Sequence, residues 1–103
     1  MRFWIWCGIS LIWTTCLRAE DLLSLADSLY AWGNHSEAIT EYRRYLFFHP
    51  RTERAGYVWY RIGLAHKALG EWNRALRAFQ RAEEHAQTDG ERDWYRVERA
   101  LIQ

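Results

Sequence analysis

Cysteine is scarce in this sequence, since only Cys7 and Cys16 occur among 103 residues and both lie near the start of the chain. The remainder therefore has neither a disulfide framework nor a cysteine metal site. Proline is rarer still, with a single residue at Pro50. The chain is 50% apolar and 26% charged, which is the composition of a globular protein and not of a disordered segment.

An excess of positive charge is also missing, because 14 Lys and Arg residues face 13 Asp and Glu residues and no long basic run stands out. A nucleic-acid-binding domain needs a strongly positive face, so we do not expect nucleic acid as a partner. Arg74, Arg77 and Arg81 form a short basic row at helical spacing. Such rows are explained by a solvated helix face.

Catalytic and metal-binding motifs are absent as well. No two of the four histidines are spaced i,i+4, the spacing that would place two metal ligands on one helix face. The sequence has no glycine-rich phosphate loop and no serine in a glycine elbow. We therefore predict no enzyme, no metal site and no cofactor.

The first residues have the pattern of a secretory signal peptide. Arg2 supplies a positive start, positions 3–15 are uncharged and mostly apolar, and Leu17-Arg18-Ala19 ends on a small residue suited to cleavage. As a helix the apolar stretch would span roughly 20 Å, short of the ~30 Å hydrocarbon core. We expect a cleaved signal peptide at residues 1–19 and export to the periplasm or cell envelope.

Two alternatives remain open for this segment. Bacterial lipoproteins are cleaved just before a cysteine, so Cys16 is a possible lipidation site, although Trp13-Thr14-Thr15 resembles the lipobox poorly. The apolar stretch could also remain as an uncleaved anchor. In each case the chain would reach a membrane only through this segment.

An internal repeat follows, because residues 22–50 align with residues 59–87 at an offset of 37. Steps of three and four residues mark helix faces, a glycine favours the end of each first helix, and Pro50 cannot continue a helix. Small residues allow two antiparallel helices to approach closely, and each helix pair leaves an apolar side that only stacking can cover. The matched pairs are Leu22 with Trp59, Leu25 with Ile62, Ala26 with Gly63, Gly33 with Gly70, Ala38 with Ala75, and Tyr42 with Phe79.

This order of residues resembles the tetratricopeptide repeat (TPR) family, and with the signal pattern it is similar to an exported bacterial TPR protein. The resemblance implies an all-α fold, an α-α superhelix of stacked hairpins, in a TPR domain at 20–103 with repeat one at 20–50 and repeat two at 56–89. Tyr45 departs from the family, which prefers alanine there, and an insertion near residues 51–55 lengthens the first repeat. The resemblance implies a repeat-packing role for Ala26, Gly33, Ala38, Tyr42, Pro50, Trp59, Gly63, Gly70, Ala75 and Phe79.

Residues 91–103 are expected to form a terminal helix with Trp94, Val97 and Leu101 on one face. Glu98 occupies a position where the family has a small residue, so a complete third repeat is not expected. Two explanations are open for this helix. It covers the second repeat as a cap, or the chain belongs to a longer array or an oligomer, because about three repeats are usually needed for stability.

In members of this family the first helices of the repeats line a concave groove that holds a peptide, so the resemblance implies such a groove here. Tyrosine and arginine contribute much of the energy of many protein interfaces. The alternative for each residue is that it only packs between neighbouring repeats and contacts no partner. The expected groove residues are Leu23, Asp27, Tyr30, Tyr57, Tyr60, Leu64, Lys67, Tyr95 and Arg99.

Together these observations predict a scaffold or adaptor for protein–protein interaction in the bacterial cell envelope, with a protein or peptide as its partner. Some family members clamp acidic C-termini through Lys and Asn, but Leu23 and Asp27 stand at those positions here, so that specific function is not expected. The alternative is a membrane-tethered structural subunit of an envelope assembly complex, held by a lipid or an uncleaved anchor.

Overall fold

The computed structural model describes residues 19–103. This part of the chain contains only helices: α2 (Ala19–Ala31), α3 (His35–Phe48), α4 (Ala55–Ala68), α5 (Trp72–Glu84) and α6 (Asp89–Ile102). The predicted all-α class is confirmed. The predicted signal peptide and the candidate lipidation site Cys16 lie outside the described residues, except for Ala19, the first residue of α2.

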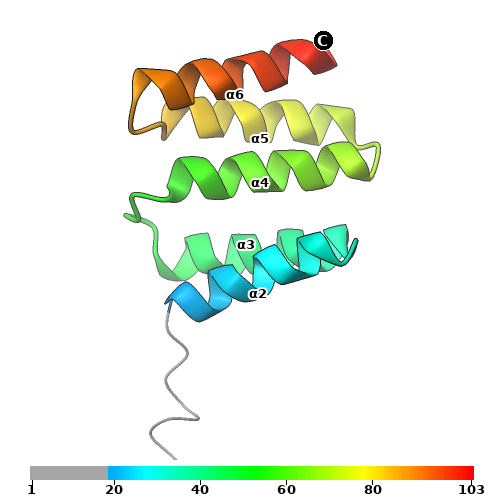
Figure 1. The fold of residues 1–103 in the computed structure, drawn as a ribbon, viewed down its shortest axis with the longest axis vertical. Coiled ribbons are helices and arrows are strands. Elements are labelled where there is room, and N and C mark those ends of the chain that lie inside the picture. Colours follow the sequence, from blue (N-terminus) through cyan, green and yellow to red (C-terminus); the bar gives the residue numbers. More distant parts are fainter. Residues whose placement is uncertain (1–18) are drawn as a thin grey trace, which may run out of the picture.

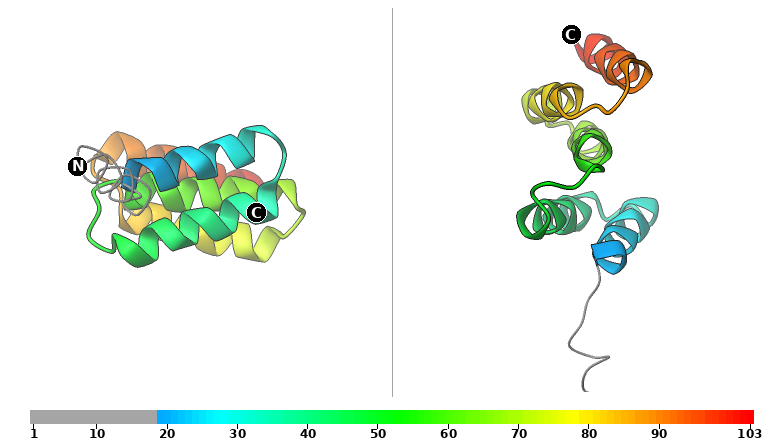
Figure 2. Two further views of the ribbon diagram at one scale, coloured as in Figure 1. Left: turned by 90° about the horizontal axis from the view of Figure 1, so that it is seen from below. Right: turned by 90° about the vertical axis from the view of Figure 1, so that its left-hand side faces the viewer.

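The helices stack in chain order, each packed against the next (Figure 1). Seen end-on, α2, α4 and α6 lie on one side of the stack and α3 and α5 on the other (Figure 2). We call the first side, which faces the viewer in Figure 1, the front face and the second side the back face. Two helical hairpins, α2–α3 and α4–α5, are thus followed by a fifth helix in the position of a further first helix.

The two hairpin turns are built in the same way. Gly33 and Gly70 both adopt positive φ, at 86° and 76°, a region that glycine enters without steric cost. In the first turn the Asn34 N–H donates to the carbonyl of Leu29 at 2.9 Å. In the second turn Glu71 donates to His66, also at 2.9 Å. The repeat offset seen in the sequence therefore reproduces the backbone hydrogen bonds of the helix ends.

The core lies between the helices at the small and aromatic positions of the repeat. A Cβ on Gly63 would come 2.5 Å from Cε1 of Phe79, so the missing side chain lets α5 place its ring directly against α4. Gly56 plays the same part at the other end of the hairpin, where a Cβ would lie 2.9 Å from the His85 carbonyl oxygen. Of the expected packing residues, Trp59 is half-buried and Pro50 is exposed. Five are fully buried: Ala26, Ala38, Tyr42, Ala75 and Phe79.

The loop between α3 and α4 accounts for the departure at Tyr45. Its side chain is buried, and its hydroxyl lies 2.8 Å from Oγ1 of Thr52, inside the loop. An alanine at this position could not reach the loop. The inserted residues therefore explain the tyrosine: its ring fills the space beside the α3–α4 loop, and its hydroxyl holds this longer loop in place.

Helix α6 begins at Asp89, two residues before the predicted start at 91. Thr88 caps it, because its Oγ1 accepts from the Glu91 N–H at 3.1 Å while the Glu91 carboxylate accepts from the Gln87 N–H at 3.0 Å. Reciprocal bonds of this kind satisfy the free N–H groups of the first turn. The cap at Thr88 therefore sets the start of α6 two residues earlier than the apolar spacing of Trp94, Val97 and Leu101 indicates.

The exposed side of α6 carries apolar residues among charged ones. Trp94, Val97 and Leu101 remain 54%, 51% and 71% exposed. A capping repeat normally presents a polar outer side, from which these three side chains depart. Glu98, which occupies the position of a small residue, instead lies 3.9 Å from Lys67 on α4 as an ion pair.

Candidate interaction face

The predicted groove residues lie on α2, α4 and α6, the three helices of the front face. Leu23 and Tyr95 are buried, at 3% and 5% exposure, so these two pack between helices, the alternative considered for each groove position. Tyr57 is exposed. The other residues of the set are half-buried: Asp27, Tyr30, Tyr60, Leu64, Lys67 and Arg99.

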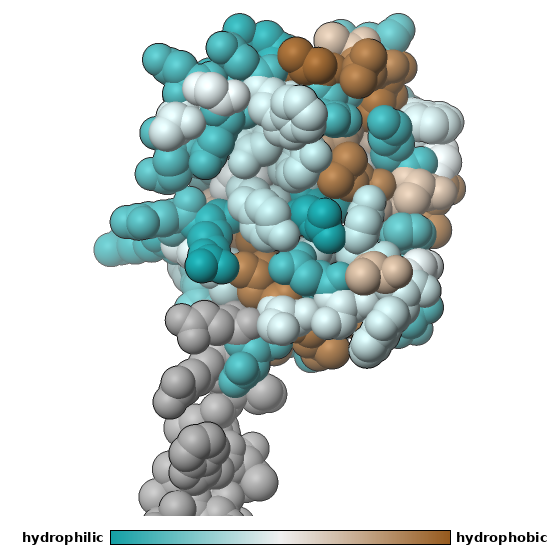
Figure 3. All heavy atoms as spheres, in the orientation of Figure 1, coloured by the Kyte–Doolittle hydropathy of each residue, from teal (hydrophilic) through white to brown (hydrophobic). Residues whose placement is uncertain are grey.

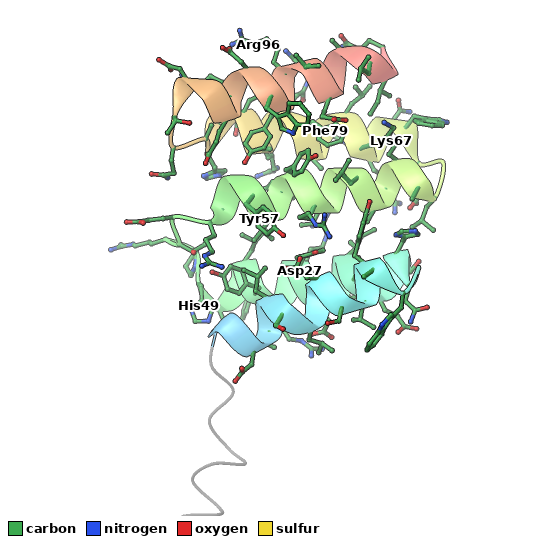
Figure 4. All side chains as sticks on the ribbon, viewed as in Figure 1. Asp27, His49, Tyr57, Lys67, Phe79 and Arg96 are labelled. Atoms are coloured by element: carbon green, nitrogen blue, oxygen red, sulfur yellow. The ribbon has the colours of Figure 1, made fainter. Side chains whose placement is uncertain are left out.

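A polar cluster joins α2 to α4 in the middle of this face. The Tyr42 hydroxyl donates a hydrogen bond to the Asp27 carboxylate, and the Tyr57 hydroxyl donates to the same carboxylate at 3.2 Å. Arg61 Nε donates to the Tyr42 hydroxyl at 3.2 Å and lies 3.7 Å from Asp27 Oδ1. Figure 4 shows Asp27 and Tyr57 directed into the space between the two helices.

The electrostatics of this cluster keep its tyrosines neutral. Burial raises the pKa of Tyr42 far above its usual value, and the hydrogen bond to Asp27 adds to the effect. The pKa of Tyr57 is raised by burial and then by the Asp27 charge. Both hydroxyls therefore keep their protons, and remain hydrogen-bond donors to Asp27, at alkaline pH values where an exposed tyrosine would ionise.

Arg61 is the functional candidate that the sequence analysis missed. Burial alone would lower the pKa of its guanidinium, but Tyr42, Tyr57 and Asp27 raise it above the usual value. The same group lies 4.1 Å from the centre of the Tyr30 ring, within cation–π range. The position of Arg61 in the sequence, directly after the expected groove residue Tyr60, does not indicate this role. Its partners are side chains of α2 and α3, which the sequence alone does not place beside it.

A second cluster holds α6 against the second repeat, α4 and α5. The rings of Tyr60 and Tyr95 are 5.2 Å apart, and Tyr60 is also 6.1 Å from Phe79. Beside them, Arg99 Nε lies 2.9 Å from a Glu83 carboxylate oxygen. Tyr60 and Arg99 therefore maintain the position of α6 as well as lining the face.

The accessible surface of the front face is polar and aromatic more than aliphatic. Hydrophilic and intermediate colours cover most of its left and central parts in Figure 3, while hydrophobic atoms gather toward the upper right. A shallow hollow of about 360 Å³ borders Asp27, between α2 and Arg54. Such a surface offers hydrogen-bond donors, a carboxylate and aromatic rings to a partner.

Other kinds of site find no support in this part of the chain. Within residues 19–103 no group of three or more His, Cys, Asp or Glu side chains is arranged to hold a metal ion. None of the five helices from Ala19 to Ile102 has both the length and the apolar character needed to cross a membrane.

Comparison with known families identifies one repeat directly. The family model of the tetratricopeptide repeat matches residues 56–89, the range expected for the second repeat and occupied by α4 and α5. Searches of curated proteins and of solved structures gave no match. Residues 56–89 are thus similar to a tetratricopeptide repeat, a module that generally mediates protein–protein interaction and is typically not enzymatic.

Proposed function

We propose that the front face binds a peptide or protein segment, so that the chain acts as an interaction scaffold. The observation that carries the proposal is the Asp27–Arg61–Tyr57 cluster, which holds charged and aromatic groups in fixed positions on the side formed by the first helices. Prepositioned side chains lose little entropy on binding. Tyrosine and arginine are also the residue types enriched among those that dominate interface energy.

Photo-crosslinking in cells tests this proposal. A photoreactive amino acid at Lys67, whose side chain is 39% exposed on α4, is expected to capture a defined protein. The same amino acid at Gln80, which is exposed on α5, is the matched control on a back-face helix. We expect the Lys67 adduct to be lost when Tyr57→Ala is added, because that change removes an accessible ring from the same face.

Two results would contradict the assignment to the front face. One is capture of the same protein with equal yield from Gln80. The other is an unchanged yield at Lys67 after Tyr57→Ala in a chain whose helical circular dichroism spectrum is intact.

We further propose that the protein is exported and acts in the periplasm or cell envelope as an adaptor. The support is the sequence pattern of residues 1–19, a positive residue, an uncharged apolar stretch and a small residue before Glu20. The second candidate, a membrane-tethered subunit, is favoured by the position of Cys16 after that stretch.

Mass spectrometry of the native N-terminus separates these candidates. A free amine on Glu20 is expected for a cleaved, exported chain. A lipid-modified Cys16 would instead support the tethered subunit, and an intact Met1 would support an uncleaved anchor. Both of these last results would contradict release by cleavage after Ala19.

A further inference from the structure

A separate cleft lies on the back face, opposite the surface considered so far. It has a volume of about 420 Å³ and is bordered by α3 and α5, with α4 contributing residues between them. In the end-on view of Figure 2, α3 and α5 lie on the same side of the stack. Its polar lining is dominated by four arginines, one from α3 and three from α5: Arg43, Arg74, Arg77 and Arg81.

An aromatic ring holds two of these arginines in place. The Arg43 guanidinium lies 5.6 Å from the centre of the Trp59 ring, and that of Arg81 lies 5.1 Å from it. Both separations are within cation–π range. Trp59 therefore positions one arginine from α3 and one from α5 around its ring. Less side-chain conformational entropy is then lost when a ligand binds.

The charge of the cleft is largely uncompensated. Arg74 pairs with Glu71 at 3.2 Å, but Arg43, Arg77 and Arg81 form no ion pair within residues 19–103. Elsewhere in the same region most arginines have a carboxylate partner, as Arg99 has in Glu83. Three guanidinium groups that share one cleft without a carboxylate favour an anionic ligand.

His66 is a second, independent indication of a ligand. It lines the cleft, it is only 4% exposed, and its Nδ1 lies 3.2 Å from a carboxylate oxygen of Glu71. Its Nε2 is buried and has no hydrogen-bond partner within the described residues. Because the Glu71 carboxylate can only accept, Nδ1 carries the proton of that pair and Nε2 is left as an acceptor. Buried polar atoms nearly always have partners in folded proteins, so this nitrogen marks a position that a hydrogen-bond donor of a bound segment, such as a backbone N–H, can complete.

We propose that this cleft binds a carboxylate-rich segment of a partner protein. Planar guanidinium groups match carboxylates in bidentate geometry. Ile39, Ala78 and the Trp59 ring supply the apolar surface on which the carbon atoms of Asp or Glu side chains pack. The site is independent of the front-face proposal, because none of its lining residues belongs to the Asp27 cluster.

A peptide fits this cleft better than nucleic acid. The two wall helices also carry carboxylates outside the cleft, Glu37 and Glu41 on α3 and Glu84 on α5, so they do not form a continuous basic surface. Nucleic acid binding requires contacts to a row of phosphates, whereas the enclosed volume accommodates only a few side chains. Inorganic phosphate is therefore a competitor in the test and not the expected ligand.

Fluorescence anisotropy with the full 103-residue chain tests the proposal. The probe is a fluorescein-labelled octapeptide of alternating glutamate and alanine, and its control has glutamine in place of glutamate. We expect the glutamate peptide to bind and Arg77→Gln/Arg81→Gln to weaken it about tenfold, as loss of two partly exposed ion pairs predicts. The matched variant, Arg51→Gln/Arg92→Gln, removes the same charge from exposed positions outside the cleft, and should change affinity less than about twofold.

The backbone amide signals of a ¹⁵N-labelled chain provide the second readout. Addition of the glutamate peptide should shift the Trp59 indole signal and amides of α5, and leave those around Asp27 and Tyr95 unchanged. Single Arg77→Gln, at a residue that makes no ring or ion-pair contact within the described region, should also weaken binding while leaving the fold intact.

Several results would overturn the proposal. These are no binding of the glutamate peptide, equal binding of the glutamine peptide, equal losses in the two double variants, or displacement by inorganic phosphate at concentrations below that of the peptide. Shifts confined to α2 and α6 would move the peptide to the front face and also reject the cleft. If no Lys67 crosslink forms while the glutamate peptide still binds the cleft, only the front-face proposal is contradicted.

Discussion

Replacing Gly63 with alanine is expected to lower the free energy of unfolding by about 1–3 kcal/mol, the usual range for overpacking a tight core. The new Cβ would lie 2.5 Å from Cε1 and 2.7 Å from Cδ1 of Phe79. The ring cannot simply swing away, because Phe79 is fully buried against α4, with its ring centre 6.1 Å from that of Tyr60. Alanine is a better helix former than glycine by about 1 kcal/mol, but this gain is smaller than the expected steric cost.

Gly90→Ala is the matched control for this change. Gly90 is also helical, and the nearest atom to a Cβ there is Oγ1 of Thr88 at 3.9 Å. The same methyl group meets no obstruction, so stability should be unchanged or higher by up to about 1 kcal/mol. Thermal and urea unfolding followed by circular dichroism would measure both variants.

A smaller side chain at position 79 should relieve the clash. Phe79→Leu alone is expected to destabilise by removing buried ring atoms. Combined with Gly63→Ala it should cost clearly less than the sum of the single changes, because the two residues are in contact. Equal stability of the Gly63 and Gly90 variants, or strict additivity with Phe79→Leu, would show that α4 and α5 do not approach as described.

The contact between Gly63 and Phe79 is also an example of what the sequence could predict. The 37-residue offset aligns Gly63 with Ala26 and Phe79 with Tyr42, and the turn glycines Gly33 and Gly70 support the same register. Small residues, helix-ending glycines and aromatic positions are local signals with a direct steric meaning. For that reason the all-α class and the hairpin pattern could be predicted from the chain alone.

The candidate sites depend on contacts that the pattern does not contain. Arg61 was missed because its partners, Asp27 and Tyr42, are distant in the sequence. The spacing of Arg74, Arg77 and Arg81 alone predicts a solvated helix face, yet the structure brings this row together with Arg43 and Trp59. Helical spacing predicts which residues share a face, but it does not show which face of another helix they meet.

The second large effect is expected for Asp27→Ala, which should lower the free energy of unfolding by about 1–3 kcal/mol, the cost of leaving buried polar groups without a partner. The Asp27 carboxylate accepts hydrogen bonds from Tyr42 and Tyr57 and lies 3.7 Å from Arg61. With alanine at position 27, the hydroxyl of the fully buried Tyr42 and the partly buried guanidinium of Arg61 would lack this acceptor. Chemical unfolding monitored by circular dichroism measures the loss.

Asp93→Ala provides the control, because Asp93 is 70% exposed and its contact with Arg96 is a surface ion pair at 3.5 Å. Exposed pairs of this kind contribute at most about 1 kcal/mol and often nothing measurable, so this variant should remain close to the parent. Adding Tyr42→Phe to Asp27→Ala removes the stranded hydroxyl, and the double variant should be more stable than the sum of the two single losses predicts. If Asp27→Ala proves as mild as Asp93→Ala, or if the two changes at positions 27 and 42 are additive, the carboxylate does not hold α2, α3 and α4 together. The front-face proposal would then lose its support too, because it relies on charged groups that this cluster holds in fixed positions.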